Sequence, residues 1–173
     1  MLAAACRQPE SPPAAAPVFS TTSTVKEIMT AIVDPAADAI WASVATIVTA
    51  TSREERQPRT DEEWAALRRY AIQLLEAPNL LQMDRGIAAP GETLEDGLGL
   101  APAAIEALVR EERATWNQYA QDLHAATLPA LEAIDAKNPQ GILDAGDGIY
   151  RACEACHMRF WYPGLIPPGV VNP

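Results

Sequence analysis

The chain has 173 residues, the length of one ordinary domain, and its composition is 49% hydrophobic but only 6% aromatic. Abundant alanine with few aromatic residues favours helices, so we expect an all-α fold. The formal net charge of -10 argues against binding to nucleic acid or to an anionic membrane. It either serves solubility alone or favours a partner protein with a basic docking surface.

The first 23 residues are expected to lie outside the folded domain as a signal remnant and a flexible tether. Met1 to Cys6 place a cysteine after small residues, as at the end of a bacterial lipoprotein signal, although Ala3 stands where leucine is usual. Lipidation of Cys6 and an unmodified Cys6 remain equal alternatives. Residues 7–23 are rich in Pro, Ala, Ser and Thr and predict a disordered tether. No run of 18 apolar residues is present, so no segment is expected to span a membrane.

A first helix is predicted to begin at Thr24, because Thr24 and Glu27 have the spacing of a capping box. Apolar residues then recur on one helical face. Pro35 interrupts this pattern, but Asp34 before it is a suitable N-cap, so we expect a kink or a restart there. The predicted apolar stripe consists of Val25, Met29, Ile32, Val33, Ala36, Ile40, Val44 and Ile47.

A second helix is predicted to begin at Thr60, again with a capping-box partner, Glu63, and to end at Pro78. Its buried side would carry Trp64, Leu67, Ala71, Leu74 and Leu75. Residues 79–101 are rich in Gly and Pro and lack periodicity. We interpret them as a crossover connection, with a functional cover over a site as the alternative.

Two further helices complete the expected fold. The third is predicted from Pro102 to about Lys137, with a kink at Pro129. The fourth follows the N-cap Asn138 and runs to about Trp161. Because no hairpin signal, strand alternation or internal repeat is evident, we expect the chain after the tether to form one antiparallel four-helix bundle. Cofactor sites in such bundles lie between facing helices.

Near the end of the fourth predicted helix, Cys153, Cys156 and His157 form the CxxCH pattern of covalent haem attachment. Each thiol can form a thioether with one vinyl group on the same edge of a porphyrin, and the histidine that follows can then reach the iron. On a helix, Cys153 and His157 lie one turn apart and leave the same face. This face also carries Ile142, Ala145, Gly146, Ile149 and Phe160. The pattern predicts one haem c, bound through Cys153 and Cys156, with His157 as an axial iron ligand.

Two other uses of the cysteines fit the sequence less well. A structural zinc site needs four ligands, and the remaining His and Cys residues are His124 and Cys6, of which Cys6 lies in the tether. A thioredoxin-like dithiol needs a CxxC at the start of a helix that follows a strand. His124 lies at the edge of an apolar helix face, so we expect a packing or surface role. Gly146, on the CxxCH face, predicts close approach by another helix or by the porphyrin.

A CxxCH at the C-terminal end of a four-helix chain resembles the class II c-type cytochromes, the cytochrome c′ group. The resemblance covers most of residues 24–162 and implies that residues 24–173 form a haem-binding domain. Phe160 matches an aromatic residue that this family has three positions after the histidine. Trp161 replaces the family's basic residue, and the ending from Trp161 to Gly164 departs from the family pattern. Members of this class are often dimers through their first helices, so a homodimer is implied as a candidate.

The resemblance also implies that the first helix supplies the residue on the open side of the iron. That residue is a methionine in six-coordinate members and a bulky apolar residue in five-coordinate members, and Met29 stands at this place. A Met thioether opposite a His is a recognised axial pair that raises the haem potential. The alternative is that Met29 only fills the core. Five-coordinate members often carry an Arg one turn earlier, where this chain has Val25.

Three functions are compatible with this pattern. The leading hypothesis is a monohaem c-type cytochrome that exchanges single electrons with a redox partner protein, with His157 and Met29 as iron ligands. On this hypothesis no residue is catalytic and the chain is not an enzyme. The second is a five-coordinate haem protein that binds nitric oxide or another small gas, and the third is a helical interaction module without haem. Because covalent haem attachment occurs outside the cytoplasm, we expect a periplasmic or outer-cell-envelope location, with Cys6 as a candidate lipid anchor.

Overall fold

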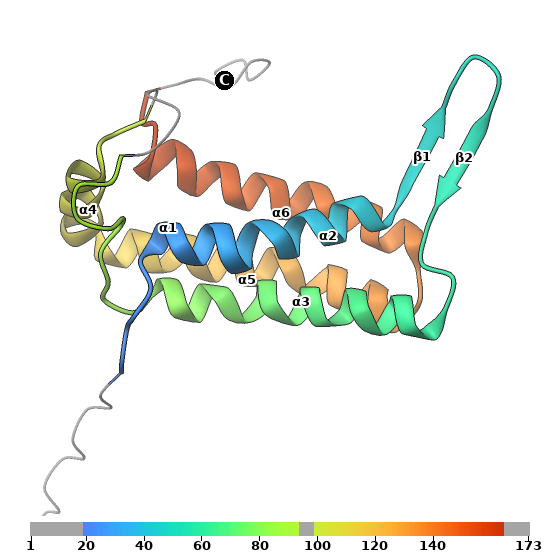
Figure 1. Ribbon diagram of the computed structural model, residues 1–173, viewed down its shortest axis with the longest axis horizontal. Coiled ribbons are helices and arrows are strands. Elements are labelled where there is room, and N and C mark those ends of the chain that lie inside the picture. Colours follow the sequence, from blue (N-terminus) through green and yellow to red (C-terminus); the bar gives the residue numbers. More distant parts are fainter. Residues whose placement is uncertain (1–18, 94–98, 165–173) are drawn as a thin grey trace, which may run out of the picture.

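A computed structural model of the chain describes residues 19–93 and 99–164, so Cys6 and most of the expected tether lie outside the described residues. The described chain is mostly helical with one small sheet (Figure 1). Its elements are α1 (Val25–Ile28), the π-helix η1 (Met29–Val33), α2 (Asp34–Ser43), β1 (Ala45–Val48), β2 (Arg53–Arg56), α3 (Asp61–Leu81), α4 (Pro102–Glu111), α5 (Arg113–Asp135) and α6 (Pro139–Phe160). Among these, no helix combines the length and the apolar character that crossing a membrane requires.

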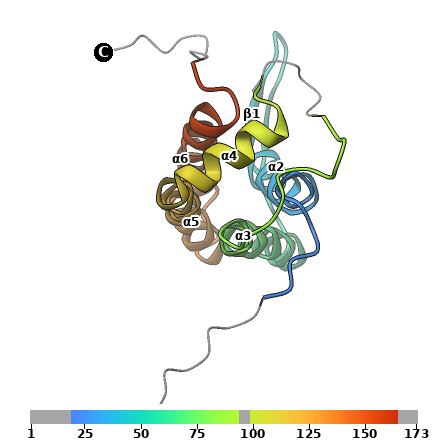
Figure 2. The same ribbon diagram turned by 90° about the vertical axis from the view of Figure 1, so that its left-hand side faces the viewer.

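The long helices share one hydrophobic interior. Helix α5 packs against α3 and α6, and α2 packs against α3 and α6. Viewed from one end, these four helices surround a common centre (Figure 2). The largest fully buried apolar side chains there are Phe160, Ile40, Leu74, Ile142 and Ile149. Burial of each such side chain contributes about 1.5–3 kcal/mol, so apolar packing is the main force that holds the helices together.

The first helical segment begins as predicted and restarts at its proline. Thr24 accepts a hydrogen bond from the Glu27 amide, and the Glu27 carboxylate accepts one from the Thr24 amide at 2.8 Å. Pro35 has no N–H, and a proline ring within a helix clashes with the carbonyl four residues earlier. The backbone widens into η1 just before it, where the Asp34 amide donates to the Met29 carbonyl across five residues. The expected restart therefore takes the form of a π-helical turn.

The prediction that this helix continues to Ile47 was wrong. Helix α2 ends at Ser43, and Val44 is extended, with φ -132° and ψ 129°. Strands β1 and β2 then pair antiparallel, with Ala45 opposite Arg56, and form a hairpin that projects from one end of the molecule (Figure 1). The β-branched residues that follow Ser43 favour this extended conformation. Positions 44 and 47 fit the period of a helix as well, which is why the sequence pattern did not reveal the strand.

The second and third predicted helices also differ from the structure. Helix α3 begins with the predicted capping box of Thr60 and Glu63 but continues through Pro78 to Leu81. Pro78 is fully buried, so apolar burial offsets the backbone hydrogen bond that its ring removes. The predicted third helix is two helices, because the backbone leaves helical geometry at Glu112, with φ -111° and ψ 40°.

Glu112, the residue at the break, contacts another helix. The Glu112 carboxylate accepts a hydrogen bond from Arg159 Nε on α6 at 2.9 Å, a contact between residues far apart in the sequence. The break turns α4 across the end of the helices, whereas α5 runs along them (Figure 2). Helix α5 includes Pro129 without interruption. The last helix, α6, begins after the N-cap Asn138 as predicted and ends at Phe160.

The capping box of α3 gives a test of the fold. Replacing Thr60 by Ala removes the hydroxyl that accepts from the Glu63 amide at 3.2 Å, and we expect it to lower the free energy of unfolding by about 1 kcal/mol. Urea denaturation followed by circular dichroism measures this change. Thr51→Ala, in the exposed hairpin turn, is the matched control and should have little effect. Equal effects of the two substitutions would contradict the capping role.

Candidate functional site

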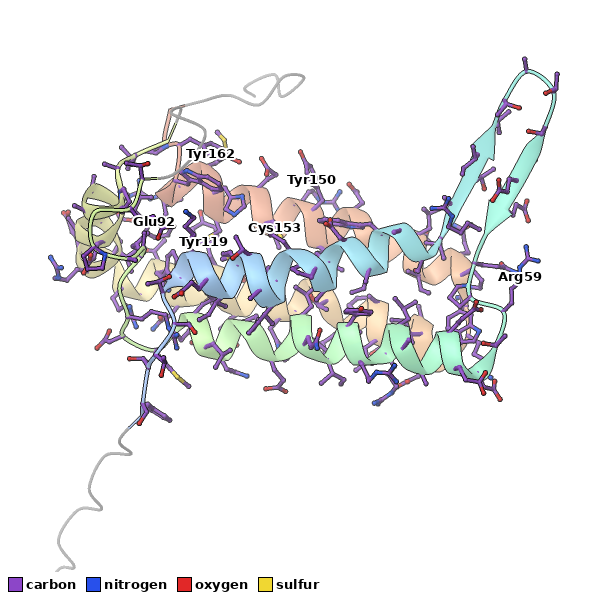
Figure 3. All side chains as sticks on the ribbon, viewed as in Figure 1. Arg59, Glu92, Tyr119, Tyr150, Cys153 and Tyr162 are labelled. Carbon is purple, nitrogen blue, oxygen red and sulfur yellow. The ribbon has the colours of Figure 1, made fainter. Side chains whose placement is uncertain are left out.

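The CxxCH residues lie in the last turns of α6, on the side that faces the other helices. Cys153, Cys156 and His157 are half-buried, and both thiols are free. The predicted face of this helix is confirmed, because the other residues assigned to it are buried: Ile142, Ala145, Gly146, Ile149 and Phe160. Figure 3 shows Cys153 between α6 and the first helical segment.

Two adjoining cavities open beside these residues. One has a volume of about 310 Å³ and the other of about 410 Å³, and Met29, Asp34, Trp116, Cys156 and His157 line both. Cys153 lines the larger one. The structure thus brings all four residues singled out from the sequence, three from α6 and Met29 from η1, to the walls of one bipartite cavity. Its combined size is within the range of cavities that hold a small-molecule cofactor.

The two cysteines are held as neutral thiols. Burial raises the pKa of Cys153 to about 11, and the nearby Asp34 carboxylate adds to this effect. Burial also raises the pKa of Cys156 to about 12. A dithiol that exchanges disulfides instead depends on a thiolate with a lowered pKa. The raised pKa values therefore argue against thioredoxin-like chemistry at these cysteines.

A measurable consequence concerns alkylation of the haem-free protein. Because a raised pKa leaves less thiolate at a given pH, iodoacetamide at pH 8 should modify Cys153 and Cys156 at least roughly tenfold more slowly in the folded protein than in the denatured chain. The rate should rise as the pH approaches the two pKa values, about 11 and about 12. Mass spectrometry of the digested peptides gives the rate at each cysteine. Equal rates in the folded and denatured chains would contradict this burial.

His157 is suited to bind a metal through a ring nitrogen. Burial lowers the pKa of its imidazole, an effect that Glu154 and Asp34 oppose. A neutral imidazole keeps a lone pair for a metal ion. Trp161 packs edge-on against the ring, with the ring centroids 5.1 Å apart and the planes at 85°. Trp161 thus restricts the orientation of the imidazole.

Met29 lies in the π-helical turn η1 and is half-buried against the hydrophobic core. The same turn brings Asp34 to the cavity. In a regular α-helix, positions five apart point in different directions, whereas in a π-helical turn they lie almost one above the other. Asp34 was expected only as an N-cap, and no pattern in the sequence predicted the π-helical turn that places it in the cavity wall. Asp34 is exposed on its solvent side, but partial burial on the cavity side raises the pKa of its carboxyl group, and His157 opposes this shift.

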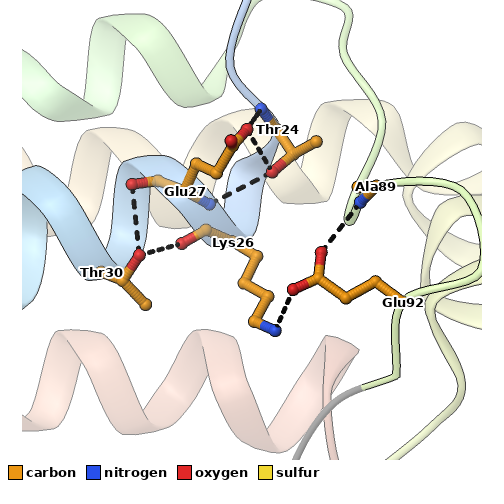
Figure 4. Close-up of polar contacts among 6 residues, drawn as sticks. All are labelled: Thr24, Lys26, Glu27, Thr30, Ala89 and Glu92. Carbon is orange, nitrogen blue, oxygen red and sulfur yellow. Dashed lines mark hydrogen bonds and ion pairs between the residues drawn. The ribbon is translucent and has the colours of Figure 1, made fainter.

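The cavity also has polar groups at one end. Trp161 Nε1 is buried without a hydrogen-bond partner, and Trp161 lines the smaller cavity. The ring lies against the backbone of Gly99, where a Cβ atom would come within 2.2 Å of it. Lys26 lines the same cavity and forms an ion pair with Glu92 (Figure 4). These donors suit the carboxylates of a porphyrin, and the remaining wall is largely apolar, so the described residues fit a haem.

Other side chains singled out from the sequence have packing roles. Trp41 Nε1 donates to the Gly146 carbonyl at 3.1 Å, so the close approach predicted at Gly146 is made by a neighbouring helix. His124 Nδ1 lies 2.9 Å from the Leu75 carbonyl, which agrees with the expected packing role. Trp116 lines both cavities, contacts Phe160 edge-on and donates from Nε1 to the Leu81 carbonyl at 2.8 Å.

Comparisons with known proteins gave no relative: no protein-family model matches the chain, and neither the characterised proteins nor the solved structures contain a match. Within residues 19–93 and 99–164, no three His, Cys, Asp or Glu side chains gather closely enough to hold a metal ion by themselves. A haem iron needs fewer ligands from the protein, because the porphyrin holds the iron.

Proposed function

We propose that this chain is a class II c-type cytochrome, an antiparallel four-helix bundle with one covalent haem, and that it transfers single electrons. The observation that carries the proposal is the convergence of Cys153, Cys156, His157 and Met29 on one bipartite cavity. The packing of α2, α3, α5 and α6 around a common interior supports the bundle class.

Each of these residues would have a defined task. The Cys153 and Cys156 thiols would form the two thioethers that hold one edge of the porphyrin. His157 and Met29 would bind the iron through a ring nitrogen and a thioether sulfur, a ligand pair that favours a high reduction potential. When bound, the haem supplies an iron that alternates between the ferric and ferrous states.

The surroundings would tune this site. Apolar wall residues such as Ile87, Ile105 and Phe160 would surround a bound haem with a low-dielectric environment, which would favour the less charged ferrous state. The net charge of -10 would favour a redox partner with a basic docking surface. Because haem c is attached outside the cytoplasm, the proposal places the protein in the periplasm or on the outer cell envelope. A homodimer and a lipid anchor at Cys6 are further parts of it.

The proposal is tested by producing the full chain together with the cytochrome c maturation machinery. We expect one covalent haem per chain, seen as a haem-stained band after denaturing electrophoresis. The ferric spectrum should be low-spin with a sulfur-to-iron charge-transfer band, and dithionite should reduce the protein reversibly. A purified, folded protein without covalent haem would refute the proposal and leave the helical interaction module as the alternative.

A further inference from the structure

Glu154, the residue after the first cysteine of the CxxCH pattern, contacts the histidine of that pattern. Its Oε1 atom lies 3.7 Å from His157 Nδ1, and the two side chains are only 27% and 28% exposed. The two residues are three positions apart on α6, which places them on the same flank of the helix. A carboxylate is therefore held beside the ring nitrogen of the candidate iron ligand.

Tyr162 fixes this carboxylate in place. Its hydroxyl donates to the Glu154 carboxylate, with distances of 3.0 Å and 3.2 Å to the two oxygens. The chain after α6 folds back because the Trp161 and Tyr162 amides both donate to the His157 carbonyl, at 2.8 Å and 3.0 Å. This backbone arrangement brings the Tyr162 ring to a centroid distance of 6.1 Å from the imidazole. Figure 3 shows Tyr162 at this end of α6.

We infer that Glu154 is a positioning residue for His157: its carboxylate accepts the Nδ1 proton and leaves Nε2 free to bind a haem iron. The inference rests on the proposed function. At 3.7 Å the two atoms lie just beyond hydrogen-bond distance, so the inferred hydrogen bond requires the two side chains to approach each other slightly. The bond from Tyr162 keeps the carboxylate beside the imidazole. A partner of this kind fixes the tautomer of a ligating histidine and raises its basicity. Because a more basic ligand and a nearby negative charge stabilise the ferric state, Glu154 should lower the reduction potential.

The test is the midpoint potential of the haem-loaded Glu154→Gln variant at pH 7. Glutamine keeps the shape of the side chain but removes its charge, and we expect the ferric-to-ferrous equilibrium to shift about tenfold toward ferrous, a rise of about 59 mV for one electron. Tyr162→Phe should shift the potential in the same direction by less, since it frees the carboxylate but keeps its charge. Spectroelectrochemical titration measures both.

Asp144→Asn is the matched control. Asp144 is an exposed carboxylate on the same helix, about 20 Å along the axis from His157, so its removal changes the net charge equally without touching the imidazole. We expect almost no change in its potential. If Glu154→Gln and Asp144→Asn shift the potential equally, the inference is overturned while the proposed function stands.

A second readout needs no haem. In the folded apo protein, nitrogen chemical shifts of His157 should show the tautomer protonated at Nδ1, and Glu154→Gln should move the population toward the tautomer protonated at Nε2. An identical tautomer population in the two proteins would overturn the positioning role. A wild-type protein without covalent haem would instead refute the proposed function, and the tautomer would still decide whether Glu154 orients His157.

Discussion

Replacing Cys153 and Cys156 together by alanine should abolish covalent haem attachment, so that haem content after denaturation falls from one per chain to none. Alanine cannot form a thioether with a vinyl group of the porphyrin. Because noncovalent contacts are lost on denaturation, a haem that is not covalently bound leaves the chain. Because a covalent link to one vinyl group is enough to retain haem on a denaturing gel, each single variant should keep a weaker stained band. Haem staining and the pyridine spectrum of the purified protein measure the loss.

Cys6 offers the matched control for this experiment. Cys6→Ala removes the third cysteine of the chain, which lies outside the CxxCH pattern, and should leave the haem content unchanged. Circular dichroism of the double variant should still show a helical protein, because both cysteines sit at the edge of the core rather than among its fully buried residues. Full retention of haem by the double variant after denaturation would contradict attachment through Cys153 and Cys156.

The parts of the fold that could be predicted from the sequence depend on local signals. Thr24, Thr60 and Asn138 begin their helices as predicted, since a capping side chain and its backbone partner lie within one turn of each other. The face of α6 that carries Cys153 and His157 was also predicted, because it follows from helical geometry alone. One helix and its periodicity were enough to define the cysteine side of the candidate site.

The parts that could not be predicted depend on features that the periodicity and caps of single helices do not describe. The break at Glu112 is tied to Arg159 on another helix, and nothing in the sequence near Glu112 signals it. The Glu154 carboxylate acquires its partner Tyr162 only because the chain folds back after α6. The position of Met29 near the cysteines was implied by a family resemblance rather than by any local pattern. The π-helical turn that contains Met29 was not predicted, since only a kink or a restart of the helix was expected there.

Met29→Ala should convert a low-spin haem into a high-spin one and lower the reduction potential. A thioether ligand stabilises the ferrous state, so its loss should shift the ferric-to-ferrous equilibrium roughly a hundredfold toward ferric, or about 120 mV. The sulfur-to-iron band should disappear at the same time. Ferric absorption spectra and a redox titration measure both effects, and haem content should stay at one per chain, because the thioethers of Cys153 and Cys156 do not depend on Met29.

The control separates loss of the ligand from loss of a methionine. Met83→Ala removes a thioether in the loop after α3, where Arg85 Nη2 lies 3.7 Å from its sulfur, and it should leave spectrum and potential unchanged. A wild-type protein that is already high-spin, and unaffected by Met29→Ala, would contradict Met29 ligation. The residue would then be only part of the apolar wall, and the open iron position beside a cavity of about 310 Å³ would favour the binding of nitric oxide or another small gas over electron transfer.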